Sequence, residues 1–293
     1  MPAPLFDSVL IANRGEIALR VIRTLRARGL TSVALFHAVD RDAPHVLAAD
    51  RAVELAGEDP RAAYLDIDRV IDAAKRAKAG AVHPGYGFLS EQARFARACE
   101  KTGLVFLGPR PETLETLGDK KRARQVARDA GLPVAPGWEG TPVGADGAPT
   151  REALVAADQL GYPVLLKAVT GGGGKGMREV RSAAELAEAL AGTAREALAS
   201  FGDAAVYMER RIEPVRHVEV QLMGDGEGGV AHLFERECSL QRRHQKIIEE
   251  APAARMTTAL RKRLTEAAKT IAKHVKYRGA GTAEFLVDEK DGI

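Results

Sequence analysis

A run of four glycines follows a buried-strand pattern in the second half of the chain and is the clearest candidate for ligand binding. The strand pattern ends near Lys167, residues 171–174 are all glycine, and Lys175, Gly176 and Met177 follow. Consecutive glycines cost backbone entropy, so they are expected where main-chain N–H groups fold closely over phosphate oxygens. The run is not a Walker A loop, because Gly176 stands where serine or threonine is required. A flexible hairpin loop is the alternative interpretation.

A second segment, residues 235–250, carries an unusual density of ionisable side chains between two strand patterns. Its cationic residues could clamp a small anion, and they are Arg242, Arg243, His244 and Lys246. A solvated charged surface is the commoner explanation of a charge run. Nucleic-acid binding is the least consistent explanation, because acidic residues flank the segment on both sides and stacking aromatic side chains are lacking.

A single glutamate near the end of the chain lies in a strand pattern. Glu284 falls within residues 282–286, where apolar and β-favouring neighbours indicate that one face of the strand is buried. A carboxylate that projects from such a strand needs a partner, for example a metal ion. A surface glutamate on an edge strand is the simpler alternative.

Residues 82–91 combine a strand end with a glycine-rich turn. In open α/β sheets, ligands bind outside the carboxyl ends of the strands, so this turn is a further candidate site. Ser90 within it is equally well explained as the N-cap of a helix.

The elements that must position these candidates begin with alternating strands and helices in the first hundred residues. Such alternation indicates βαβ units and a parallel sheet. Gly15 follows the first strand alone and no G-x-G-x-x-G pattern occurs, so a nicotinamide site is excluded. The expected strands are residues 8–12, 32–36, 81–83 and 105–107, and the expected helices are residues 16–28, 67–77 and 91–102.

The rest of the chain predicts a mixed arrangement that includes a hairpin, with a glycine- and proline-rich linker or surface loop at residues 136–149. The chain stops just after a turn signal at residues 291–292, with no returning strand, so we expect a fragment cut within a hairpin. The expected helices are residues 119–130, 151–160, 182–198 and 257–277, and the expected strands are residues 164–169, 178–180, 205–209, 217–223, 230–234 and 282–287.

Composition limits the class of protein. The length of 293 residues suggests about two domains, and 45% hydrophobic with 28% charged residues excludes a disordered chain. The formal charge is only +3 and both signs are mixed, which argues against a nucleic-acid partner. No apolar run approaches membrane-spanning length. Only Cys99 and Cys238 occur, and Cys99 shares a helical face with Phe95, which predicts a packed core thiol. No leader pattern opens the chain, so a cytoplasmic location is expected.

Seven segments together resemble the biotin carboxylase family of ATP-grasp enzymes, and the resemblance covers essentially residues 5–293. The segments occur in the order and at the spacing of that family, which makes them far more specific than an isolated glycine motif. They are residues 11–18 (IANRGEIA), 83–91 (HPGYGFLSE), 118–120 (GDK), 167–177 (KAVTGGGGKGM), 216–219 (RHVE), 241–246 (QRRHQK) and 277–282 (YRGAGT).

The resemblance implies a fold and an activity. The fold is α/β, with a Rossmann-like domain over residues 1–118 and an incomplete ATP-grasp domain over residues 119–293. The latter would divide into a glycine-loop lid, residues 135–205, and the start of a C-terminal lobe, residues 206–293. The activity would be ATP-dependent carboxylation of biotin by bicarbonate through carboxyphosphate, with Mg²⁺ or Mn²⁺, as the first half-reaction of an acetyl-, propionyl- or methylcrotonyl-CoA carboxylase or a pyruvate carboxylase.

The resemblance also implies site residues. Lys246 would bind bicarbonate, and Glu284 would bind Mg²⁺. Lys120 and Lys167 would contact phosphates, and residues 209–212 would hold adenine at a hinge. The full set of nucleotide-binding residues implied is Lys120, Lys167, Gly172, Gly173, Gly174, Met177, Glu209, Arg210, Arg211, Ile212, His217, Gln241 and His244.

Parts of the family pattern fall outside this sequence. A second metal-binding Glu, an Asn, a catalytic Arg and a base Glu are expected beyond Ile293, so the chain alone is expected to have little activity. No Met-Lys-Met motif occurs, so the biotin carboxyl carrier is expected on another chain or in the missing part. A carboxyltransferase and a second copy of the chain are the other expected partners, with no nucleic acid and no membrane. Thr170 stands at the first position of the family's glycine run, which we expect to be tolerated.

Two alternative functions are kept. Another ATP-grasp ligase, which joins a carboxylate to an amine, would share the lysines and the lid but would not be expected to match residues 242–246 so closely. A non-catalytic nucleotide-binding module is the other, because catalytic groups of the family are missing from the sequence.

Overall fold

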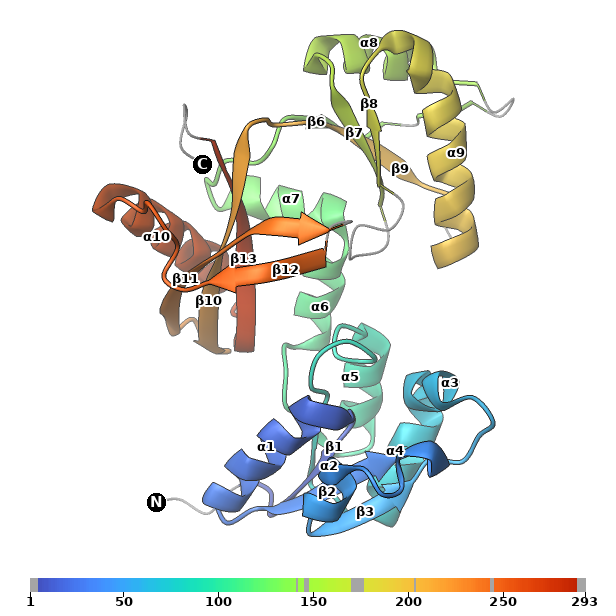
Figure 1. Ribbon diagram of the computed structural model, residues 1–293, viewed down its shortest axis with the longest axis vertical. Helices are drawn as coiled ribbons and strands as arrows, with labels where there is room; N and C mark the ends of the chain where they lie inside the picture. The colour runs from blue at the N-terminus through green and yellow to red at the C-terminus, as the bar shows by residue number, and fades with distance from the viewer. Residues whose placement is uncertain are drawn as a thin grey trace. The chain divides into compact units, whose positions relative to one another are not determined.

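The computed structural model describes residues 5–140, 142–144, 148–169, 177–202, 204–242 and 245–288. It divides into two compact units, Met1–Glu115 and Thr116–Ile293, and the division falls inside helix α6 (Pro111–Gly118). The first unit is built around one sheet and the second around two, and Figure 1 labels most of their strands. The mixed α/β class predicted from the sequence is confirmed.

The first unit contains a five-stranded parallel sheet in the order β3-β2-β1-β4-β5. The central strands are apolar throughout, as expected for parallel strands covered on both faces. The four predicted strands are confirmed, whereas β3 was missed because its Arg51 and Glu54 give an edge strand a polar pattern. The strands are β1 (Ser8–Ile11), β2 (Thr31–Phe36), β3 (Arg51–Glu54), β4 (Ala81–His83) and β5 (Val105–Phe106).

Helices cover both faces of this sheet, because alternate residues of β1 enter different cores. Val9 and Ile11 pack with α1, whereas Leu10 packs with the cluster that contains Tyr64 and Phe95. The three predicted helices are confirmed, although α5 starts at Ala93 with Gln92 as its N-cap, so the suggestion that Ser90 caps it was wrong. The helices are α1 (Gly15–Ala27), α2 (Pro44–Ala48), α3 (Pro60–Leu65), α4 (Ile67–Arg76) and α5 (Ala93–Lys101), with a short 3₁₀ turn at Ala38–Asp40.

The second unit begins with a small antiparallel sheet in the order β6-β9-β7-β8. Helices α8 and α9 cover one of its faces, as Figure 1 shows, and Leu166, Val180 and Met208 pack beneath them. The alternate residues of the same strands face away from these helices. The elements are α7 (Lys120–Asp129), β6 (Gly137–Trp138), α8 (Arg151–Leu160), β7 (Val164–Ala168), β8 (Met177–Val180), α9 (Ala183–Phe201) and β9 (Val206–Arg210).

A larger antiparallel sheet follows, in the order β12-β11-β10-β13, with α10 on one face. The predicted hairpin is confirmed, but the charged segment 235–250 does not lie between strands. It forms the second half of β11 and all of β12, because one face of this hairpin is open and accepts charged side chains. The elements are β10 (Val215–Asp225), β11 (Val230–Arg242), β12 (Gln245–Glu250), α10 (Thr258–His274) and β13 (Arg278–Asp288).

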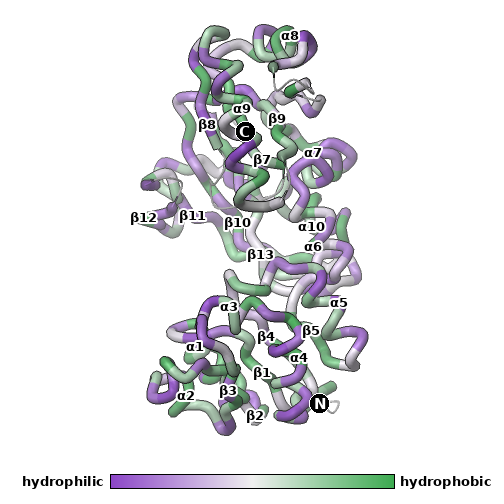
Figure 2. Tube along the Cα trace, turned by 90° about the vertical axis from the view of Figure 1, so that its right-hand side faces the viewer, coloured by the Kyte–Doolittle hydropathy of each residue, from purple (hydrophilic) through white to green (hydrophobic). Residues whose placement is uncertain are grey.

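Hydropathy follows burial along these elements. Helix α7, drawn largely in hydrophilic colours in Figure 2, buries none of its residues completely. Among the residues that the structure describes, every helix is too short or too polar to cross a membrane.

Each unit holds one buried free thiol, and this gives a test of the fold. Burial raises the pKa of Cys99 to about 12 and that of Cys238 to about 11. A thiol with such a pKa is almost entirely protonated at pH 8 and therefore unreactive. We expect neither cysteine of the folded protein to react with Ellman's reagent at pH 8, and both to react in denaturant. Rapid reaction of one thiol without denaturant would contradict the packing of the unit that contains it.

Candidate functional site

Two cations meet at the start of the second unit. Asp119 caps α7, because its carboxylate accepts from the backbone N–H groups of Lys121 and Arg122 at 2.9 and 3.1 Å. This cap places Lys120 in the first turn, where its Nζ donates to the carbonyl of Ala168 on β7 at 3.2 Å. Burial lowers the pKa of Lys120, and the nearby positive charge of Lys167 lowers it further.

The open face of the small sheet carries a polar cluster around Glu209. Glu209 is 5% exposed and its carboxylate accepts from Lys167. Tyr207 donates to its other oxygen at 3.2 Å, and an Arg124 guanidinium nitrogen lies 3.8 Å from the same oxygen. Met177 pairs with Lys167 across β7 and β8 and so lies on the same face. The buried carboxylate thereby has two hydrogen-bond donors and a nearby guanidinium, which offset the cost of its burial.

The chain then crosses from the small sheet to the large one. The N–H of Arg210 donates to Pro136 at 2.8 Å, and that of Arg211 donates to Pro163 at 3.0 Å. This crossing lines a cavity of about 630 Å³, which also receives side chains from both sheets. The cavity-lining residues that the sequence singled out are Lys167, Glu209, Arg210, Arg211, Ile212 and Glu284.

The open face of the large sheet holds a second charged cluster. Glu219 on β10 lies directly opposite Glu284 on β13 and directly opposite Arg236 on β11. The Nζ of Lys246 on β12 donates to Glu219 and, at 2.5 Å, to Glu284. Arg236 donates to Glu219 at 2.6 Å and to Gln221 at 3.0 Å. The ammonium of Lys246 therefore bridges two facing carboxylates.

The side chains of this cluster differ in how far they are exposed and in the direction in which their pKa values are shifted. The side chain of Glu219 is 3% exposed, whereas that of Glu284 is 61% exposed. Burial acts to raise the pKa of Glu219, but hydrogen bonds from Lys246 and Arg236 outweigh it, so the pKa is lowered. Burial acts in the opposite sense on Lys246, and the hydrogen bonds to Glu219 and Glu284 keep its pKa well above the ordinary value. Glu219 and Lys246 are therefore both charged at neutral pH.

Two further predicted residues lie on the same sheet. His217 pairs with Leu286 on β13 and lies two residues before Glu219, so it shares the open face. Its backbone N–H donates to the hydroxyl of Ser239 at 2.8 Å. Gln241 pairs with Lys246 across β11 and β12, and its amide donates to the carbonyl of Cys238 at 2.9 Å. Arg243 and His244, like Gly172, Gly173 and Gly174, lie outside the described residues.

The first unit has its own junction of two family segments. The side chain of Asn13, after β1, donates to the carbonyls of Pro84 and Tyr86, after the neighbouring strand β4, at 2.9 and 2.7 Å. Gly85 has φ +67°, and a Cβ there would lie 2.5 Å from the Asn13 amide nitrogen. The glycine is therefore required by the close approach of the two turns. This junction is at the carboxyl ends of the central strands, as the sequence predicted.

Sequence reasoning missed four residues of these clusters. None of them was given a role, although Glu219 ends the matched segment 216–219 and Arg236 lies in the charged segment 235–250. Arg124 is four residues after Lys120 on one helix and so shares its face, and Glu219 follows His217 in the alternation of a strand. The residues missed are Arg124, Tyr207, Glu219 and Arg236.

Two family models match the chain, the first ending inside α6 and the second beginning just after it. The biotin carboxylase N-terminal domain matches residues 5–114, and the ATP-binding domain of the carbamoyl-phosphate synthase L chain matches residues 119–293. Together they account for nearly the whole sequence, in the order expected from the resemblance.

Curated proteins and a solved structure agree with these models. Biotin carboxylase 2 of Bacillus subtilis is 46% identical over 289 residues, and pyruvate carboxylase of the same organism is 50% identical over 283 residues. The biotin carboxylase domain dimer of Hydrogenobacter thermophilus 2-oxoglutarate carboxylase, in complex with MgADP, ADP and bicarbonate, superposes with a TM-score of 0.92 at 42% identity. These matches cover 99%, 96% and 99% of this chain, respectively.

The relatives are longer than this chain. It spans 64% of the biotin carboxylase 2 sequence, 24% of the pyruvate carboxylase and 63% of the 2-oxoglutarate carboxylase domain.

Replacing Glu219 and replacing Glu284, the two carboxylates that Lys246 contacts, should change the free energy of unfolding by different amounts. Glu219→Gln leaves two cations against a buried neutral amide, so we expect a loss of about 3 kcal/mol in the free energy of unfolding. Glu284→Gln removes an exposed carboxylate from the same lysine and should cost less than about 1 kcal/mol. Urea unfolding followed by the fluorescence of Trp138, the single tryptophan, measures both in the second unit. Equal losses would contradict the assignment of Glu219 as the buried anchor.

The lowered pKa of Glu219 also predicts the direction in which its contribution to stability changes with pH. A carboxyl with a lower pKa in the folded state stabilises the protein above its unfolded pKa, and this contribution is lost as pH falls through the folded pKa. The stability difference between the wild type and Glu219→Gln should therefore shrink on acidification. A difference that grows at acid pH would contradict this prediction.

Proposed function

The chain belongs to the biotin carboxylase family of ATP-grasp proteins, and from that premise we propose that it catalyses the ATP-dependent carboxylation of biotin by bicarbonate. The single observation that supports this most is the shared cavity: Lys167 and Glu209 line it from one sheet, and Glu284 lines it from the other. Its volume of about 630 Å³ is within the range of small-ligand sites. Lys246 donates directly to Glu284, which places the lysine at the margin of the same site.

The nucleotide is ATP, and its phosphates lie against Lys120 and Lys167. The two ammonium groups are close enough for one to lower the pKa of the other, so a triphosphate between them relieves their repulsion. Residues 209–212 hold the adenine along the crossing between the sheets, with Met177 and His217 as further contacts. The family resemblance assigns Gly172, Gly173 and Gly174 to the phosphates, and Gln241 and His244 complete the nucleotide-binding set.

Glu284 fits a magnesium ligand. Its carboxylate is exposed on an open sheet face, and Mg²⁺ is commonly held by one or two carboxylates together with substrate phosphates. Within the described residues there is no cluster of three or more His, Cys, Asp or Glu side chains, and Glu284 is the residue of this stretch assigned to the ion. When bound there, the ion would neutralise charge on the transferring phosphoryl group.

Lys246 binds bicarbonate and holds it for attack. Bicarbonate is a weak nucleophile, so it must be held in line with the γ-phosphorus of ATP. One of its oxygens bonds to that phosphorus as the bond to ADP breaks, which yields carboxyphosphate. The hydrogen bonds to Glu219 and Glu284 keep Lys246 protonated, so it offers a cation to the anion throughout the neutral range. Exclusion of water protects the carboxyphosphate until its CO₂ unit is transferred to the ureido nitrogen of biotin.

The partners follow from this reaction. A biotin carboxyl carrier and a carboxyltransferase are required to deliver biotin and to consume its carboxyl group, as in the acyl-CoA and pyruvate carboxylases. A homodimer is supported by the dimer named for the 2-oxoglutarate carboxylase domain. Two free thiols are consistent with a reducing compartment, and we place the protein in the cytoplasm.

The proposed function predicts two dependences of ADP formation. The full-length protein with MgATP should form ADP only when bicarbonate and biotin are both present. Lys246→Gln should lower the bicarbonate-dependent rate by at least about 100-fold, because the cation that holds the anion is lost. A coupled assay for ADP measures both. An unchanged bicarbonate dependence would remove Lys246 from its role, and turnover with an amine in place of biotin would favour another ATP-grasp ligase. Nucleotide binding without turnover would favour the non-catalytic module.

The lowered pKa of Lys120 predicts a pH effect on nucleotide affinity. A lysine whose pKa is lowered loses its proton as pH rises before an ordinary lysine does, so affinity for MgADP should fall at alkaline pH. Lys120→Arg keeps its charge and should flatten that fall, with affinity within about tenfold of the wild type at pH 7. Calorimetric titration with MgADP across the alkaline range compares the two. Parallel curves would show that Lys120 is not the titrating group.

A further inference from the structure

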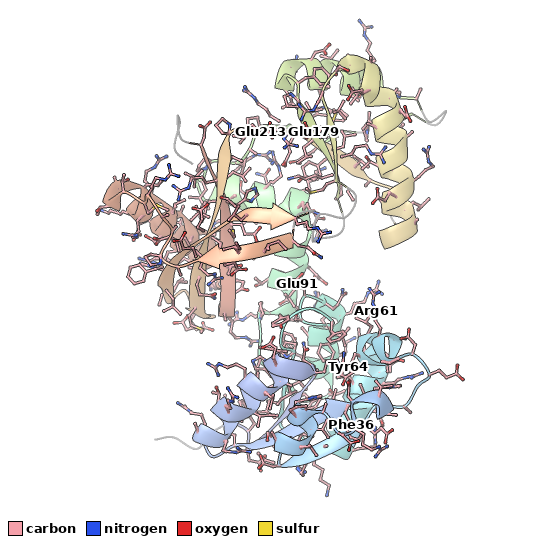
Figure 3. The ribbon with its side chains drawn as sticks, in the orientation of Figure 1. Phe36, Arg61, Tyr64, Glu91, Glu179 and Glu213 are labelled. Atoms are coloured by element: carbon pink, nitrogen blue, oxygen red, sulfur yellow. The ribbon has the colours of Figure 1, made fainter. Side chains whose placement is uncertain are left out.

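Arg211 joins strand β8 to the crossing between the two sheets of the second unit. Its Nη1 donates to Glu179 on β8, and its Nε donates to Glu213 at 2.5 Å. β9 ends at Arg210 and β10 begins at Val215, so Arg211 and Glu213 both belong to the crossing itself. Figure 3 labels Glu179 and Glu213, which lie next to one another at this point.

Strand register places this trio on the open face of the small sheet. Glu179 pairs with Leu165, and Leu165 pairs with Glu209, so Glu179 and Glu209 face the same way. Arg211 is two residues beyond Glu209 and continues the alternation. Arg211 and Glu213 both line the cavity.

The pairs are well balanced and partly protected from water. The side chain of Glu179 is 22% exposed and that of Arg211 is 33% exposed. Arg181 lies 2.6 Å from the second oxygen of Glu179, so two arginines face two glutamates, Glu179 and Glu213. Ion pairs with this degree of burial and with shared partners couple more strongly than isolated surface pairs.

Within the part of the chain that the structure describes, the backbone hydrogen bonds of the crossing lie at one of its ends. The N–H groups of Arg210 and Arg211 donate to Pro136 and Pro163, both on the side of the small sheet. Glu213 leads into β10 of the large sheet. Side-chain bonds from Arg211 to Glu179 and to Glu213 therefore connect the fixed end of the crossing to the end that enters the large sheet.

We propose that Glu179, Arg211 and Glu213 form an ionic latch that fixes the crossing and so positions the main-chain groups of residues 210–212 on the cavity wall. The inference rests on the proposed function, because those main-chain groups are the ones assigned to adenine. Glu179 and Arg211 act as positioning residues through their side chains. The latch sets the affinity for nucleotide and leaves the handling of bicarbonate at Lys246 unchanged.

A double-mutant cycle on the full-length protein tests the latch, with MgADP as the probe and calorimetry as the measurement. Glu179→Gln and Arg211→Gln should each weaken MgADP binding by about three- to tenfold, and the double variant should be no weaker than the weaker single variant. Arg181→Gln is the matched control, because Arg181 contacts the same carboxylate from the end of β8 and does not reach the crossing. It should change MgADP affinity by less than about twofold.

Steady-state kinetics separates positioning from a merely structural role. The KM for ATP should rise in Glu179→Gln by the same factor as the MgADP dissociation constant, with kcat and the KM for bicarbonate unchanged. If Arg211→Gln does not fold, Arg211→Lys is the substitute. It keeps the positive charge but loses the guanidinium that donates to both glutamates, so it should give an intermediate loss of MgADP affinity.

Three outcomes would overturn the inference. They are additive losses in the cycle, an Arg181→Gln effect as large as that of Glu179→Gln, and variants that bind MgADP as tightly as the wild type. A wild-type protein that does not bind MgADP would instead overturn the proposed function, and the latch with it.

Discussion

Two carboxylates that face each other on neighbouring strands, Glu219 and Glu284, are the constraint on which this site depends. Like charges directly opposite in a sheet repel, and one of these carboxylates is also buried. The ammonium of Lys246 resolves both problems, since it donates to each carboxylate. β12 must therefore lie where its lysine reaches over β10. The fold of the charged hairpin and the place of the reactive cation are consequences of one electrostatic requirement.

Both sheets of the second unit use the alternation of a strand in the same way. One face is apolar and packs against helices: Met208 packs with α8 and α9, and Val218 packs with α10. The other face carries ionisable groups, Lys167 and Glu209 on one sheet and Glu219 on the other. Because each core holds its strands in register, the backbone beneath the charged side chains has a defined position. The cavity lies where groups from the two open faces come together.

Local sequence patterns predicted where the helices and strands lie better than they predicted which strands pair with one another. Apolar runs identified the buried parallel strands, and β3 was missed because an edge strand with Arg51 and Glu54 lacks such a run. The charged segment 235–250 was not recognised as strand, since charges on an open sheet face remove the apolar signal. That Glu219 faces Glu284 depends on register between strands far apart in the sequence, which no local periodicity encodes. The family resemblance assigned roles to Lys246 and Glu284, whereas Glu219, the buried carboxylate that holds Lys246, was part of a matched segment without a role.

The most direct test of the role of Lys246 is to measure whether an oxygen atom of bicarbonate is transferred to inorganic phosphate. If Lys246 holds bicarbonate for attack on the γ-phosphorus, a bicarbonate oxygen becomes bonded to phosphorus and stays there when carboxyphosphate gives up its CO₂. The full-length protein, supplied with MgATP, biotin and ¹⁸O-labelled bicarbonate, should release inorganic phosphate that carries one labelled oxygen, as detected by mass spectrometry. Unlabelled phosphate would mean that water or another nucleophile attacks ATP, and it would contradict the role given to Lys246 and to the cluster that positions it.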